Sequence, residues 1–232
     1  MDPMIVFIIN VVFCSIVVAV HLDRRVRERE RVGDITKCFL IPSLYLTLFT
    51  ASKAFPREIY RPELLFLIAF FYTLGDILLL KKTPTWRFLV GALSFICGHI
   101  VYIIYFSHFG LNIYTLLGGM ILFGIPLIYL ILKIIKSNPK YTVGYIIYGL
   151  TLYFFGVGMS AVFSFKYLKT SILVFIGVWL FIYSDSRIAL NSLLKDGKNR
   201  SFMIMLTYIA ANLFLVLGVW CINVPLTAVT HN

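Results

Sequence analysis

The chain has 232 residues, of which 60% are hydrophobic and only 13% are charged. About 25% of the residues in a typical soluble domain are charged, and a soluble globule this apolar would expose much of its apolar surface to water. The composition therefore excludes an ordinary soluble domain and predicts an integral membrane protein. The net charge of +11 would attract polyanions. The basic residues lie in short segments between apolar stretches, however, which argues against a nucleic acid partner.

Apolar stretches recur along the whole chain and predict an all-α bundle of about eight transmembrane helices. A helix needs about 20 residues to cross the hydrocarbon core. The second stretch is short and contains Pro42, and the first lacks the basic segment and cleavage site of a signal peptide. We expect one polytopic membrane domain over residues 1–232, with spans at residues 4–20, 38–51, 63–80, 86–106, 111–132, 141–165, 171–190 and 202–222.

The distribution of basic residues predicts the orientation of this domain. Sixteen of the 21 lysines and arginines follow odd-numbered spans, and five lie on the opposite side. Because cytoplasmic loops are enriched in Lys and Arg, we expect the basic loops in the cytoplasm and both termini outside. The host membrane is expected to be a bacterial cytoplasmic membrane, or the endoplasmic reticulum in a eukaryote. The run from His21 to Arg31 is predicted to be a solvated loop at the lipid head groups, with a dedicated anionic-lipid site as the alternative.

The four cysteines give no sign of a metal site or of a disulfide framework. They are far apart, and each lies in or beside an apolar stretch. Neither a CxxC motif nor a Cys/His cluster is present, so we expect the cysteines to act as small packing residues and expect no metal or cofactor. They are Cys14, Cys38, Cys97 and Cys221.

Two aspartates, Asp76 and Asp185, lie deep inside predicted spans, the third and the seventh. A charged carboxylate at the bilayer centre costs about 2.5–3.5 kcal/mol even on lenient scales, so such residues often have a function. At about 1.5 Å per residue, both lie roughly 20 Å below the outer start of their spans. If they converge, one would be protonated and the other ionised, giving an acid and a base in one site. The alternative is a structural contact of each aspartate with a hydroxyl, amide or basic side chain.

Polar and aromatic residues accompany the aspartates. In the fourth span, Gly91, Phe95, His99 and Tyr102 share one helical face, and in the eighth span Tyr208 and Asn212 share another. A hydrogen bond between helices is the alternative role of His99. Lys37, at the cytoplasmic start of the second span, either holds a phosphate or extends toward the head groups. The residues expected to line a site are Lys37, Tyr72, His99, Tyr102, Ser184, Tyr208 and Asn212.

A weak internal repeat links the third and fourth spans to the seventh and eighth. Asp76 and Asp185 are each followed by a helix in which an arginine precedes an aromatic residue and then a polar residue at the same spacing. The first set is Arg87, Phe95 and His99, and the second is Arg200, Tyr208 and Asn212. The pattern favours two parallel four-helix halves, with chance matches among so few positions as the alternative.

These motifs resemble the YhhN family of multi-pass membrane lysoplasmalogenases. The resemblance runs over most of the chain and is strongest at Leu74-Gly75-Asp76 and at residues 91–102, 181–189 and 207–212. Asn212 stands where the family more often has glutamine. The resemblance implies hydrolysis of the vinyl ether bond of lysoplasmalogens, which releases a fatty aldehyde and a glycerophospho-choline or -ethanolamine without a metal or cofactor.

The implied reaction suits the two aspartates. Protonation of a vinyl ether on carbon gives an oxocarbenium-like species that water captures, so the reaction needs a proton donor and a base. We expect Asp76 and Asp185 to supply both, in an order that the residues do not assign, with the lysophospholipid bound within the bilayer. The rivals are a proton-coupled transporter that uses the same Asp and His residues as a relay, and a lipid-binding or scaffold protein without turnover.

Overall fold

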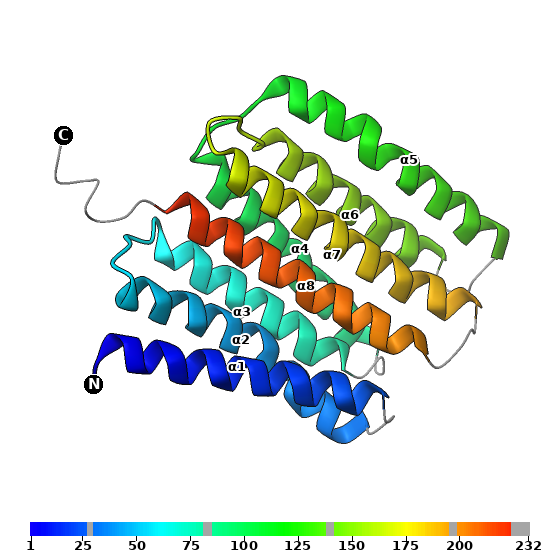
Figure 1. Ribbon diagram of the computed structural model, residues 1–232. Helices are drawn as coiled ribbons and strands as arrows, with labels where there is room; N and C mark the ends of the chain where they lie inside the picture. Colours follow the sequence, from blue (N-terminus) through cyan, green and yellow to red (C-terminus); the bar gives the residue numbers. More distant parts are fainter. Residues whose placement is uncertain (27–29, 81–84, 138–141, 195–198, 224–232) are drawn as a thin grey trace. The chain divides into compact units, whose positions relative to one another are not determined.

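A computed structural model of the chain describes residues 1–26, 30–80, 85–137, 142–194 and 199–223, and it is all-α. Eight helices follow one another along these ranges (Figure 1). They are α1 (Pro3–Val26), α2 (Glu30–Ala54), α3 (Pro62–Leu79), α4 (Thr85–Ser107), α5 (Ile113–Ser137), α6 (Thr142–Ala161), α7 (Leu168–Leu194) and α8 (Asn199–Ile222).

Most of these helices have the length and composition of membrane spans. Among the described residues, seven helices are long and apolar enough to cross a membrane, and α6 contributes a shorter apolar segment, Ile146–Ala161. Their outward faces carry large apolar side chains such as Ile8, Phe66, Ile121 and Phe154, each of them more than half exposed. Lipid is the medium that accepts such faces. The predicted helical membrane bundle is therefore confirmed, and the chain is a multi-pass membrane protein.

The prediction of a solvated loop between the first two spans is wrong for most of that segment. Helix α1 continues to Val26 and α2 already begins at Glu30, so that α2 runs through Pro42. His21 is fully buried, and its Nδ1 atom lies 3.1 Å from the Gly33 carbonyl oxygen and 2.9 Å from the Thr36 hydroxyl. Hydropathy detects only the part of a helix that lies in hydrocarbon, whereas charged residues with good helix propensity extend it further.

Part of the predicted basic loops cannot be compared with the structure. Several of their residues lie outside the described ranges: Arg27, Arg29, Lys81, Lys82, Lys140, Lys195 and Lys198. Lys133 and Lys136, predicted to follow the fifth span, lie instead in the last two turns of α5.

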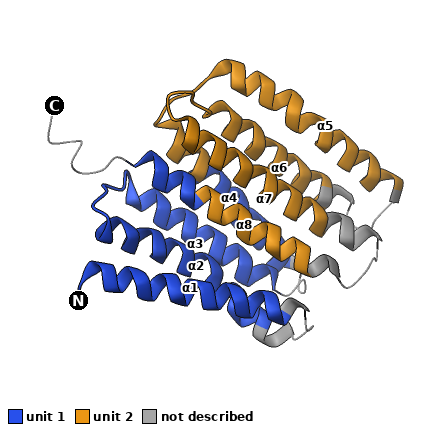
Figure 2. Cartoon of the chain, viewed as in Figure 1, with its two compact units in different colours: residues 1–101, 216–232 blue, residues 102–215 orange. Residues whose placement is uncertain are grey.

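The chain divides into two compact units (Figure 2). Unit 1 comprises residues 1–101 and 216–232, and unit 2 comprises residues 102–215, so the boundaries fall within α4 and α8. In unit 1, α1 packs against α2 and α2 packs against α3. In unit 2, α5 packs against α6, and both α5 and α6 contact α7. Each unit contains one of the two buried aspartates.

In unit 1, the loop between α2 and α3 fastens the end of α8. The Arg57 guanidinium donates to the carbonyl oxygens of Trp220 and Asn223, both at 3.2 Å, and lies 4.5 Å from the centre of the Trp220 ring. The Asn223 side chain accepts the Tyr60 backbone N–H at 2.8 Å. These contacts satisfy carbonyl groups that the end of a helix leaves without intrahelical donors.

Candidate functional site

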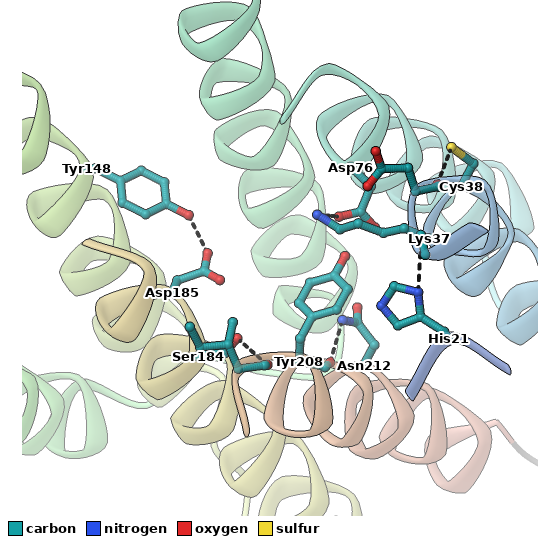
Figure 3. A network of polar contacts seen from close by, with 12 residues as sticks. His21, Lys37, Cys38, Asp76, Tyr148, Ser184, Asp185, Tyr208 and Asn212 are labelled. Carbon is teal, nitrogen blue, oxygen red and sulfur yellow. Dashed lines mark hydrogen bonds and ion pairs between the residues drawn. The ribbon is translucent and has the colours of Figure 1, made fainter. Parts of the chain in front are cut away.

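Asp76 in unit 1 forms an ion pair with a lysine from the neighbouring helix. The Lys37 ammonium on α2 lies 3.1 Å from Oδ1 of Asp76 on α3, as Figure 3 shows. The two side chains are 14% and 1% exposed, so the pair is largely shielded from solvent. Lys37, expected to hold a phosphate or to extend toward the head groups, is instead engaged with the aspartate. Removing one partner of such a buried pair leaves the other charge uncompensated.

Helix α1 and the start of α2 hold the lysine in place. His21 contacts the hydroxyl of Thr36, the residue directly before Lys37 in the chain. Because the Gly33 carbonyl can only accept a hydrogen bond, the contact between it and His21 requires a hydrogen on Nδ1. Thr36 also donates to that carbonyl at 3.1 Å. This small network fixes the first turns of α2 against α1, and with them the stem of Lys37.

A second polar pair in unit 1 joins α3 to α4. The Tyr72 hydroxyl lies 2.8 Å from Nδ1 of His99, and both residues are buried. Tyr72 precedes Asp76 by one helical turn, so the two share a face of α3. The helices approach closely here, because a Cβ added at Gly98 would lie 2.4 Å from the Tyr72 ring. The structure thus brings two of the expected site residues together, in the hydrogen bond between helices that was the alternative role of His99.

Asp185 in unit 2 is bonded to a residue that the sequence did not single out. The hydroxyl of Tyr148 on α6 donates to Oδ2 of Asp185 on α7 (Figure 3). Asp185 is 3% exposed, and α6 and α7 pack side by side. Tyr148 is one of 14 tyrosines, and nothing in the chain around it marks it as polar-facing. The contact depends on how α6 is rotated about its own axis relative to α7, and a single sequence does not reveal that rotation.

The other expected residues of unit 2 lie between α7 and α8. The Ser184 hydroxyl donates to the Ile204 carbonyl at 3.0 Å and so fastens the two helices. The Tyr208 ring packs on Phe181 with 5.7 Å between centroids. Asn212 is 1% exposed, and its Nδ2 atom donates to the Tyr208 carbonyl at 2.9 Å. Tyr102 is also buried, but its ring stacks on Phe106 of its own helix.

The aromatic neighbours of the two aspartates match in kind. Tyr72, four residues before Asp76, packs on Phe95 of α4 with 5.4 Å between ring centres and 57° between ring planes. Phe181, four residues before Asp185, packs on Tyr208 of α8 at 5.7 Å and also 57°. Both pairs use positions that the internal repeat equates. The repeat itself stays a prediction, and these pairs are independent geometric support for it.

In each unit an aspartate is contacted by a polar side chain of a neighbouring helix. Asp76 has an ammonium and Asp185 has a phenol. Such contacts suit a structural role and also suit carboxyl groups held in position for proton transfer. Among the described residues, no group of three or more His, Cys, Asp or Glu side chains is arranged to hold a metal ion.

Comparisons with known proteins identify the family of the chain. No curated protein and no solved structure matches it. The model of the YhhN family matches residues 33–219, which is most of the chain and includes α3, α4, α7 and both aspartates. This chain therefore belongs to the YhhN family.

Proposed function

We propose that this protein is a lysoplasmalogenase, which hydrolyses the vinyl ether bond of lysoplasmalogens within the bilayer. The observation that carries the proposal is that each of the two membrane-buried aspartates is held by one specific polar side chain from the preceding helix. Family membership supports the same chemistry. The products are a fatty aldehyde and a glycerophospho-choline or -ethanolamine.

The reaction can be written with two carboxyl groups alone. One carboxylic acid donates its proton to the outer carbon of the C=C bond, and the electron pair of that bond forms the new C–H bond. The resulting oxocarbenium carbon takes up water, which loses a proton to the other carboxylate. The hemiacetal then breaks its C–O bond to the glycerol oxygen, which receives the proton held by the second carboxyl. The hemiacetal hydroxyl gives its proton to the first carboxylate, so that the aldehyde leaves and both carboxyls return to their starting states. Paired carboxyls perform related oxocarbenium chemistry in glycosidases.

We assign the acid and the base to Asp76 and Asp185, with one carboxyl acting as the acid and the other as the base. Lys37 and Tyr148 are positioning residues in this scheme, because each would act through the aspartate that it contacts. Tyr72 and His99 are proposed to contact the substrate in unit 1, and Tyr208 and Asn212 in unit 2. The alkenyl chain would lie between helices, with the phosphate toward the basic cytoplasmic rim.

Aldehyde release from a lysoplasmalogen by purified protein in detergent tests the proposal. We expect turnover by the wild type and at least a 1,000-fold loss in Asp76→Asn and in Asp185→Asn, because neither amide can exchange a proton with the substrate, and this corresponds to about 4 kcal/mol. A thermal melt of each variant checks that the fold persists. Normal turnover by both variants would contradict the mechanism.

Two other outcomes would favour the rival functions. Proton flux in vesicles that depends on Asp76 and Asp185, without any aldehyde, would favour a transporter. Saturable lysolipid binding without turnover at any pH or in any detergent would favour a lipid-binding protein. Absence of aldehyde under all these conditions would sink the assignment as a lysoplasmalogenase.

A further inference from the structure

Asn212 carries a buried hydrogen-bond acceptor to which no described residue donates. Its side chain is 1% exposed, and its Oδ1 atom has no hydrogen-bond partner among the residues that the structure describes. Buried polar groups nearly always have a partner, and a carbonyl oxygen without one carries a desolvation penalty. Such an atom points to a ligand or water that supplies a donor.

The orientation of the amide is fixed by its surroundings. Nδ2 donates to the Tyr208 carbonyl at 2.9 Å. Turning the amide over would place two acceptor oxygens against each other, so the hydrogen bond defines which end is nitrogen. The oxygen must therefore face away from the Tyr208 carbonyl and can only accept.

Another buried asparagine, Asn223 directly after the end of α8, has a purely structural role. Asn223 also donates through Nδ2 to the carbonyl four residues earlier, that of Val219, at 2.6 Å. Its Oδ1, however, accepts the backbone N–H of Tyr60 at 2.8 Å. The two residues are alike in burial and in the Nδ2 contact. They differ in the oxygen: Asn223 Oδ1 accepts a hydrogen bond from Tyr60, whereas no described residue donates to Asn212 Oδ1.

The packing of α7 on α8 places this oxygen on the same side as Asp185. Three contacts between these helices define an antiparallel register: Gly177 with Ala211, Phe181 with Tyr208, and Ser184 with Ile204. Tyr208 shares a helical face with Asn212, and Phe181 shares one with Asp185. The ring contact therefore turns these two faces toward each other. Figure 3 shows the polar side chains of this part of unit 2.

The same register gives the distance that a ligand would have to bridge. Asp185 lies at about the same height along the helix pair as Ile204, because its neighbour Ser184 contacts Ile204. Asn212 follows Ile204 by eight residues, which is about 12 Å along the axis of α8. Helical side chains lean toward the N-terminus of their helix, which shortens the separation along the axis between these two side chains. A lysolipid that contacts both residues must span this separation between its vinyl ether and its sn-2 hydroxyl.

We propose that Asn212 Oδ1 accepts a hydrogen bond from the free sn-2 hydroxyl of a lysoplasmalogen and so selects lysolipids over lipids without that hydroxyl. The inference rests on the proposed function and names the feature of the substrate that this position recognises. In a choline lysoplasmalogen the sn-2 hydroxyl is the only hydrogen-bond donor, and it lies two carbons from the vinyl ether oxygen. A site built to bond a substrate hydroxyl discriminates strongly against the analogue that lacks it.

The test measures binding and does not depend on turnover. The probes are a choline lysolipid with a saturated, non-hydrolysable sn-1 alkyl ether and its analogue with hydrogen in place of the sn-2 hydroxyl. We expect the wild type to bind the hydroxyl lipid about 10- to 100-fold more tightly, as the loss of one buried hydrogen bond implies. Asn212→Leu should bind both lipids with similar Kd, and Asn223→Leu should keep the wild-type ratio despite a lower melting temperature.

The outcomes separate this inference from the proposed function. Equal binding of the two lipids by the wild type would overturn the inference, as would a ratio that persists in Asn212→Leu or failure of both lipids to bind. Those results would mean that a water molecule satisfies Oδ1. Asn212→Ala serves if the leucine variant does not fold, because it also removes the acceptor and should lose the ratio. Aldehyde release is measured separately, so its absence alone would contradict only the proposed function.

Discussion

The contact between Lys37 and Asp76 allows structural and chemical roles of one carboxyl to be separated. Lys37→Met leaves the Asp76 carboxylate buried without its ammonium, and we expect it to lower the free energy of unfolding by about 3–5 kcal/mol. Adding Asp76→Asn removes the uncompensated charge and should recover most of that loss. The double variant should nevertheless remain inactive, because its carboxyl is gone.

Unfolding of each variant in mixed micelles and aldehyde release from lysoplasmalogen are the two measurements. Lys53→Met is the matched control, since this lysine lies in the last turn of the same helix with an exposed side chain. It should behave as the wild type does. If Lys37→Met were as stable as the wild type, the buried ion pair would not be an important contact.

Tyr148 offers the corresponding experiment on the other aspartate. Tyr148→Phe keeps the ring and removes only the hydroxyl that donates to Asp185. Because that contact positions the carboxyl, we expect kcat to fall about tenfold, which corresponds to about 1.4 kcal/mol, while the KM for lysoplasmalogen changes little. Tyr153→Phe, five residues further along α6, is the control. An unchanged kcat in Tyr148→Phe would remove this tyrosine from the proposed site.

At the level of elements, the fit between α3 and α4 depends on a glycine. A Cβ at position 98 would lie 2.4 Å from the ring of Tyr72, whose hydroxyl contacts His99. Gly98→Ala must therefore displace the ring or separate the helices, at a cost of about 1–3 kcal/mol. At Gly118 in α5 nothing lies within 4 Å of the added Cβ, so Gly118→Ala should be neutral or stabilising by up to about 1 kcal/mol.

Melting temperatures of the two alanine variants in the same detergent check this difference. Aldehyde release should fall in Gly98→Ala along with stability, because the Tyr72–His99 pair moves. A Gly98→Ala variant as stable as Gly118→Ala would show that the Tyr72 ring adjusts without cost.

The elements themselves were largely predictable, and their lateral contacts were not. Apolar stretches about 20 residues long locate helices because only a helix satisfies its own backbone in lipid. The same signal placed the start of the second span at residue 38 although α2 begins at Glu30, since hydropathy ends where the hydrocarbon ends. Asp76 and Asp185 were predictable as site residues because burying a carboxylate in the bilayer has a high free-energy cost. Their partners Lys37 and Tyr148 depend on which helices are neighbours and how they are rotated.

At the scale of the whole molecule, the two units repeat one relation between three helices. In each unit an aspartate is contacted by a side chain of the preceding helix, and the residue one turn before it packs on an aromatic ring of the following helix. The partners differ, an ammonium in one unit and a phenol in the other. A repeat that has diverged in this way would give two like carboxyls unlike environments, which is what a division into acid and base requires.

The predicted orientation is a property of the whole chain and has a direct test. The excess of basic residues after odd-numbered spans predicts that the end of α5 lies in the cytoplasm and the segment between α2 and α3 outside. In a variant without the four native cysteines, Glu58→Cys should react with a membrane-impermeant maleimide on intact cells. Lys136→Cys should react only after permeabilisation. Both side chains are exposed, so burial would not hide either thiol. The reverse labelling pattern would invert the topology and place the Lys37–Asp76 pair near the outer surface.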